Sequence, residues 1–158
     1  MKLLPFILCL CLISCGKVKQ IDTSEIKEVM RNSKIKRVTE KQLLEKVSEV
    51  GEAISARLNG NYRVECQATY EIDGHRVELY SAALTGPELL DGSIKGQLLE
   101  AYKYGIENGQ PVGTNIQLLN DSLYAYSFPL RKDTYLKTTC GHDFALVILS
   151  KPQLVKQL

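Results

Sequence analysis

An apolar segment near the start of the chain decides which residues are left to fold into a domain. Leu3–Ile13 is eleven residues long, is interrupted only by Pro5, and follows the positively charged Lys2. A membrane-spanning helix needs roughly 20 residues, so this shorter segment is typical of a secretory signal peptide. The remainder of the 158 residues suits one domain rather than two.

A lipidation motif ends this segment at Cys15. Before the cysteine come the aliphatic Leu12, a position that accepts many residue types, and the small residue Ser14. Gly16 follows the cysteine. This order resembles the lipobox of bacterial lipoproteins, whose cysteine becomes the lipidated N-terminus. The resemblance implies a lipoprotein signal peptide over residues 1–14 and a lipidated tether over residues 15–24. The alternative is an ordinary signal peptide in which the cysteine has no role.

The residues after Cys15 also bear on the membrane that holds the protein. Gly16 stands where the inner-membrane retention signal of enteric bacteria has aspartate, and no acidic cluster follows. Two or three acyl chains on Cys15 would hold the protein firmly on a lipid bilayer. We therefore expect a lipid-anchored protein of the bacterial cell envelope, on the periplasm-facing side of the outer membrane.

The charge balance excludes one class of partner. The chain carries 20 basic and 18 acidic side chains, a formal net charge of +2. Nucleic-acid binding usually requires a strongly basic face, so we expect no nucleic-acid partner. A hydrophobic fraction of 44% and a charged fraction of 24% are ordinary for a globular domain.

Helical spacing of apolar residues marks three segments. A short one covers Ser24–Met30. Thr39, with Gln42 three residues later, forms a capping-box pattern at the start of a longer helix that ends near Asn59–Gly60. A further amphipathic helix is expected over Ser93–Glu107.

The middle of the chain changes to the two-residue alternation of half-buried strands. Tyr62–Ala68 and Val77–Ser81 show this pattern on either side of Asp73–Gly74, a preferred hairpin turn. We therefore expect a β-hairpin between the longer helix and the helix over Ser93–Glu107.

Three further strands complete the expected sheet. Asn115–Leu118 and Ser122–Phe128 form a second strand pair, and Phe144–Leu149 is continuously apolar, which is typical of a central strand. The fold class is therefore α+β, with a long N-terminal helix and a second helix packed beside an antiparallel sheet. We expect a single domain over residues 25–158.

Several short motifs, taken in order, resemble a bacterial family of unknown function that has a PAS-like sensor fold. They are Lys36–Glu40, Leu99–Tyr102, Asn108–Pro111, Asp121–Tyr126 and Pro129–Leu130. Many members of this family are lipoproteins or sensor ectodomains, and many carry c-type haem. The resemblance implies a PAS-like arrangement of the sheet and its helices, with a central cavity.

The chain departs from the haem-carrying members at one place. Where they have Cys-x-x-Cys-His, Lys137 occupies the position of a first cysteine and Gly141 separates Cys140 from His142. The motif that attaches haem covalently is therefore missing, and we expect no cofactor. The alternative is a haem or redox protein that keeps the cofactor non-covalently, with His142 or His75 as the axial ligand.

Cys66 and Cys140 are the only cysteines left once Cys15 is lipidated and Cys9 and Cys11 are removed with the signal peptide. In an oxidising compartment the two can form a disulfide, which would stabilise the fold. They can equally be two separate buried thiols. The sequence leaves both possibilities open.

Two chemical alternatives involve the same residues. A metal site could combine Cys66, His75, Cys140, His142 and Asp143, but their spacing matches no recognised ligand pattern. Cys140 could act as a nucleophile with His142 as its base, yet nothing in the sequence locates an orienting group or an oxyanion hole. We expect no metal and no enzymatic activity.

The tyrosines of the predicted second helix and fourth strand are the candidates for a binding site. Tyr102, Tyr124 and Tyr126 would flank the central cavity of a PAS-like fold, and tyrosine combines apolar area with a polar hydroxyl. Ordinary core packing is the alternative. With Cys140 and His142, these are the predicted ligand-binding residues.

The expected function is a non-catalytic, sensor-like module that binds a small molecule or an envelope protein. A structural lipoprotein without any ligand is a further possibility.

Overall fold

The computed structural model describes residues 38–60, 62–63, 65–89 and 92–158. The predicted signal peptide (1–14), the tether (15–24) with its lipidation site Cys15, and the short helix over Ser24–Met30 lie outside the described residues. Val38–Leu158 form one compact unit. Among the described residues, no helix has the length and apolarity required to span a membrane.

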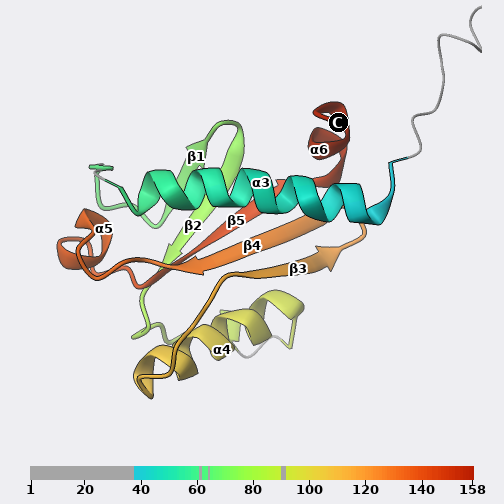
Figure 1. Ribbon diagram of the computed structural model, residues 1–158. Helices are drawn as coiled ribbons and strands as arrows, with labels where there is room; N and C mark the ends of the chain where they lie inside the picture. The colour runs from blue at the N-terminus through green and yellow to red at the C-terminus, as the bar shows by residue number, and fades with distance from the viewer. Residues whose placement is uncertain (1–37, 61, 64, 90–91) are drawn as a thin grey trace, which may run out of the picture. The chain divides into compact units, whose positions relative to one another are not determined.

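The centre of the fold is a five-stranded antiparallel sheet with the strand order β1-β2-β5-β4-β3 (Figure 1). The strands are β1 (Thr69–Ile72), β2 (His75–Tyr80), β3 (Asn115–Asn120), β4 (Leu123–Pro129) and β5 (Phe144–Ser150). The described helices are α3 (Glu40–Leu58), α4 (Ile94–Glu107), α5 (Tyr135–Thr138) and α6 (Lys151–Lys156), with a 3-10 turn η2 (Pro87–Leu89). The predicted α+β class and the central position of the last strand are confirmed.

The start of α3 follows from the predicted capping box. The Thr39 hydroxyl accepts a hydrogen bond from the Gln42 backbone N–H at 3.3 Å, and the Gln42 side chain accepts one from the Thr39 N–H at 2.9 Å. These two bonds satisfy groups that the first turn leaves unpaired. The helix then buries a single stripe of residues: Leu43, Val47, Gly51, Ile54 and Leu58.

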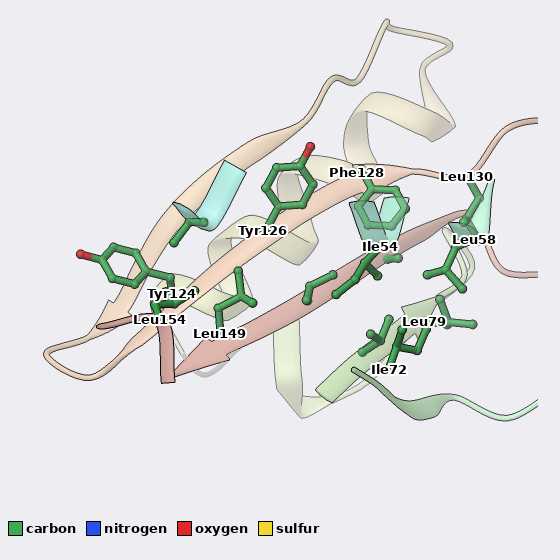
Figure 2. Close-up of a cluster of buried hydrophobic side chains, with 14 of the residues drawn as sticks. Ile54, Leu58, Ile72, Leu79, Tyr124, Tyr126, Phe128, Leu130, Leu149 and Leu154 are labelled. Carbon is green, nitrogen blue, oxygen red and sulfur yellow. The ribbon is translucent and has the colours of Figure 1, made fainter. Parts of the chain in front are cut away.

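This stripe packs on one face of the sheet and forms the larger core. Tyr124, Tyr126 and Phe128 follow one another along β4 beneath α3, as Figure 2 shows. Tyr126 requires glycine at position 51, because a Cβ on Gly51 would overlap its ring. Leu154 of α6 closes the same core at the far end of β5.

The opposite face of the sheet is covered by α4. Ser93 caps this helix by accepting a hydrogen bond from the Gly96 N–H at 2.9 Å. The helix packs Leu99 and Tyr102 against the sheet, where the Tyr102 ring stacks on Phe144 at 4.9 Å. The two long helices therefore lie on different faces (Figure 1).

The first hairpin turns where the sequence predicts, but its first strand is shorter. Asp73 and Gly74 have φ values of 52° and 77°, as the predicted turn requires. The strand expected over Tyr62–Ala68 is wrong, because β1 begins only at Thr69. Just before it, the Gln67 N–H and the Tyr70 hydroxyl both donate to the Glu65 carbonyl, so this backbone is bonded locally.

Candidate functional site

A groove of about 420 Å³ lies between the loop that follows α4 and the segment that follows β4. Figure 1 shows both segments at the end of the sheet where α5 lies. Ile106, Pro111 and Val112 form its wall on the α4 side. The loop leaves the helix through Gly109, whose φ of 64° favours glycine and ends α4 as the sequence predicts.

The opposite wall is held in place by hydrogen bonds from two other elements. Pro129 and Leu130 line it. The Leu130 N–H donates to the Asp143 carbonyl at 2.8 Å. Asn59, which caps the end of α3, accepts from the Arg131 N–H at 2.7 Å. This wall is therefore positioned by both α3 and the segment that leads into β5.

Three charged residues complete the lining: Lys132, Lys137 and Asp143. The Lys137 ammonium lies 3.0 Å from one Asp143 carboxylate oxygen, and the other oxygen accepts from the Ala82 N–H at 2.7 Å. Burial alone would raise the pKa of Asp143, but the Ala82 bond and the nearby Lys137 charge outweigh it, so its pKa is lowered. Asp143 is therefore ionised at neutral pH, and each of its carboxylate oxygens has a bonding partner.

Two of the predicted tyrosines support the groove from outside it. The Tyr102 hydroxyl donates to the Gly113 carbonyl, and the Tyr126 hydroxyl hydrogen-bonds to Thr114. Burial is the main cause that raises the pKa of both phenols. Because these tyrosines lie on different faces of the sheet, they fix the segment between α4 and β3 from two sides.

A disulfide joins Cys66 to Cys140, with a Cα–Cα distance of 5.2 Å. It connects the segment before β1 to the turn between α5 and β5. The alternative of two separate buried thiols is therefore wrong, and Cys66 is in fact exposed. The loop that carries Lys137 and Asp143 is consequently anchored at Cys140, midway between them.

His142 reinforces this anchor. Its ring hydrogen-bonds to the backbone of Gln67, the residue after Cys66. The backbone N–H of His142 donates to the Leu136 carbonyl at 3.0 Å. Burial lowers the pKa of His142, and this effect exceeds the opposing ones of Gln67 and Asp143. The imidazole is therefore neutral at neutral pH.

The five predicted ligand-binding residues do not form one site. Tyr124 lies in the core beneath α3, at 2% exposure, while Tyr102 packs on the other face of the sheet. Tyr126 packs on α3, and Cys140 and His142 lie near Lys137 and Asp143. Among the described residues that line the groove, none is one of these five.

The metal-site and nucleophile alternatives both required a free Cys140 thiol. Cys66 and Cys140 are bonded to each other, so neither offers a thiolate to a metal or a substrate. Within the described part of the chain, no three His, Cys, Asp or Glu side chains are grouped as a metal would require.

A second hollow among the described residues has a different lining. A cavity of about 480 Å³ runs along the edge strand β1, where Thr69, Glu71 and Arg76 are exposed and polar. Ligand sites usually combine mainly apolar walls with a few polar groups. The groove beside α4 matches that pattern better.

Sequence reasoning missed the groove because no local pattern joins its two walls. Asn108–Pro111 and Pro129–Leu130 were both prominent as motifs, and both contribute to the lining. Their proximity depends on the pairing of β3 with β4, which brings the ends of these two segments together. No motif or spacing in the sequence marks Lys132 or Lys137 as a binding residue.

Comparisons with known protein families, with curated proteins and with solved structures find no match to this chain. The fold and the groove therefore define its class by themselves. It is an α+β domain with a ligand-sized groove at one end of an antiparallel sheet.

Proposed function

We propose that this protein is a lipid-anchored envelope lipoprotein whose α+β domain binds a small molecule or a partner protein without catalysing a reaction. The observation that carries the binding role is the groove of about 420 Å³, with apolar walls and charged residues in its lining. Its volume lies within the range of roughly 300–1,000 Å³ that is usual for ligand pockets.

The envelope location rests on two independent features. The lipobox-like sequence that ends at Cys15 supports lipidation and anchoring to a bilayer. The Cys66–Cys140 disulfide supports an oxidising compartment such as the periplasm, since stable disulfides are rare in the cytosol. Together they favour a periplasmic location on a membrane anchor, and Gly16 in place of aspartate favours the outer membrane.

A non-catalytic role is supported by the state of the charged groups in the groove. The Asp143 carboxylate is occupied by Lys137 and by the Ala82 N–H. A general base needs a carboxylate that is available to take a proton from a substrate. The groove is thus better suited to binding than to proton transfer.

The PAS-like, sensor-like assignment is part of this proposal. The five-stranded antiparallel sheet supports it, as does the location of the shared motifs. Lys36–Glu40 ends in the first residue of α3, and Asn108–Pro111 and Pro129–Leu130 both border the groove.

A haem-binding or redox role is the second candidate, favoured by a specific observation. His75 Nδ1 and His142 Nε2 are buried and have no hydrogen-bond partner among the described residues. An imidazole nitrogen of this kind can serve as an axial haem ligand. Titration with haemin would then produce a visible absorption band that His142→Ala or His75→Ala removes.

A thermal-shift screen tests the binding role. The purified protein is heated with a library of small envelope metabolites, and a true ligand raises Tm further as its concentration increases, with a logarithmic dependence above its Kd. Ligands that raise the Tm of the native protein should no longer raise the Tm of Val112→Asp, because this substitution changes the groove wall. A structural lipoprotein without a ligand predicts no Tm increase with any compound.

A further inference from the structure

The charges of the groove do not balance. Asp143 is its only carboxylate among the described lining residues, and Lys137 lies 3.0 Å from it. Lys132 has no carboxylate partner within the described residues. Its neighbour Arg131 is paired with Asp133 at 2.8 Å, so Asp133 is already engaged. The groove therefore has one positive charge in excess.

The groove is also lined by apolar side chains. Val112 and Pro111 face the hollow from the α4 side and Pro129 faces it from the β4 side, where Leu130 also lines the wall but is only 3% exposed. Apolar surface of this kind gains free energy when it is covered by an apolar ligand. A ligand that satisfies both parts needs an apolar body and one negative charge.

We propose that the groove binds a small monocarboxylate with an apolar body, whose carboxylate pairs with Lys132 while its body covers Val112 and Pro129. This inference rests on the proposed binding function and names its ligand class. A hydrogen bond between an ammonium and a carboxylate is about twice as strong as one between neutral groups, so the charge selects the ligand.

The same charges disfavour two related classes. A cationic ligand would meet Lys132 and Lys137 without a free carboxylate, since Asp143 is occupied. A dianionic phosphate would need a second free cation, but Lys137 already pairs with Asp143. A single carboxylate matches the single unpaired ammonium.

A matched ligand series tests this proposal on the intact lipidated protein in detergent micelles. Hexanoate, pentan-1-ol, pentylammonium and pentyl phosphate share one five-carbon apolar chain and differ only in the head group. Binding is measured by calorimetry and corrected with protein-free micelles. We expect hexanoate to bind in the low millimolar range and the other three to bind at least about tenfold more weakly.

Substitutions locate the bound carboxylate. Lys132→Gln should weaken hexanoate by roughly fivefold to tenfold, while Lys132→Arg should retain it. Lys132 is exposed, so its substitution leaves the core intact. Lys41→Gln, an exposed change on α3 outside the groove lining, is the matched control and should leave the affinity unchanged.

Two outcomes would overturn the proposal. One is a pentan-1-ol, pentylammonium or pentyl phosphate affinity equal to or above that of hexanoate. The other is an unchanged hexanoate affinity in Lys132→Gln. If a different head group bound and Val112→Asp abolished that binding, the groove would remain a ligand site and only the carboxylate class would be wrong. The thermal-shift screen decides the broader binding role separately.

Discussion

At the scale of single residues, the groove depends on a close contact in which a larger side chain would force its neighbour to shift. Gly105 is buried in α4, and a Cβ at this position would overlap Val112 Cγ1. Val112 is part of the groove wall, so the width of the groove is coupled to the absence of a side chain at Gly105.

Gly105→Ala should therefore displace Val112 and weaken ligand binding. The loop moves to relieve the overlap, which costs stability. Alanine favours the helix over glycine by up to about 1 kcal/mol, so the free energy of unfolding should change little. Calorimetric affinity and Tm are measured together. The double variant Gly105→Ala/Val112→Ala removes the overlap and should retain the loop position; a single variant with normal affinity would contradict this coupling.

The buried His75 and the half-buried His142 set the response of the protein to acid between pH 7.5 and 5. Burial lowers the pKa of His75, although Asp73 partly offsets this effect, and burial likewise lowers the pKa of His142. The unfolded chain therefore binds protons more readily than the folded protein. Stability is complete above the ordinary histidine pKa of about 6.5, and it falls as the pH decreases below that value.

Chemical unfolding between pH 7.5 and 5 measures this dependence. His75→Phe removes one titrating group, so its stability should fall less steeply with acid than that of the native protein, whatever its stability at pH 7.5. His142→Phe should act in the same direction. A slope that matched the native slope in both variants would show that other groups control the acid response.

At the scale of elements, the disulfide and α3 hold the groove together from outside. Cys140 lies between Lys137 and Asp143 and is bonded to Cys66, 74 residues earlier in the chain. Asn59 at the end of α3 holds the neighbouring segment through the Arg131 N–H. The wall that follows β4 and the charged residues Lys137 and Asp143 are thus held from outside the groove.

Removal of the disulfide should destabilise the domain and loosen one wall. For a loop of this length the expected loss is roughly 4 kcal/mol. Hydrogen exchange of residues 134–143 should accelerate after reduction, and ligand affinity should fall. Cys66→Ser/Cys140→Ser is the control, because a reductant should leave its Tm unchanged. If reduction left the native Tm unchanged, the bond would contribute nothing to folding.

The sequence predicts the elements that carry their own signals. Thr39 with Gln42, Ser93 and Asp73–Gly74 mark helix starts and a turn through side chains or backbone preferences that act within a few residues. The strand expected over Tyr62–Ala68 failed because a disulfide and local hydrogen bonds govern that backbone. The short helices α5 and α6, of 4 and 6 residues, are too brief to show a period.

The candidate site follows the same division. The tyrosines were identified as important, and two of them do contact the segment before β3. The groove itself joins residues near position 110 to residues near position 130 and to Asp143. Only the sheet order brings these segments together, and the spacing of residues along the chain does not contain that information.

At the scale of the whole molecule, the sheet separates two cores, each covered by one long helix. The core beneath α3 includes Tyr124 and Leu154, and the core beneath α4 is built around Phe144. Because both faces are covered, the hollow remains at the end of the sheet, where loops from both halves of the chain meet.

The intact mass of the protein purified from its own membrane tests the central claim, a lipid-anchored binding module, most directly. Under denaturing conditions we predict a chain that begins at Cys15 and carries acyl groups, with no further increment. Under native conditions an additional small-molecule increment should appear, and Val112→Asp should lose it. A chain that retains residues 1–14 without acylation, or a haem-sized increment that survives denaturation, would contradict the account.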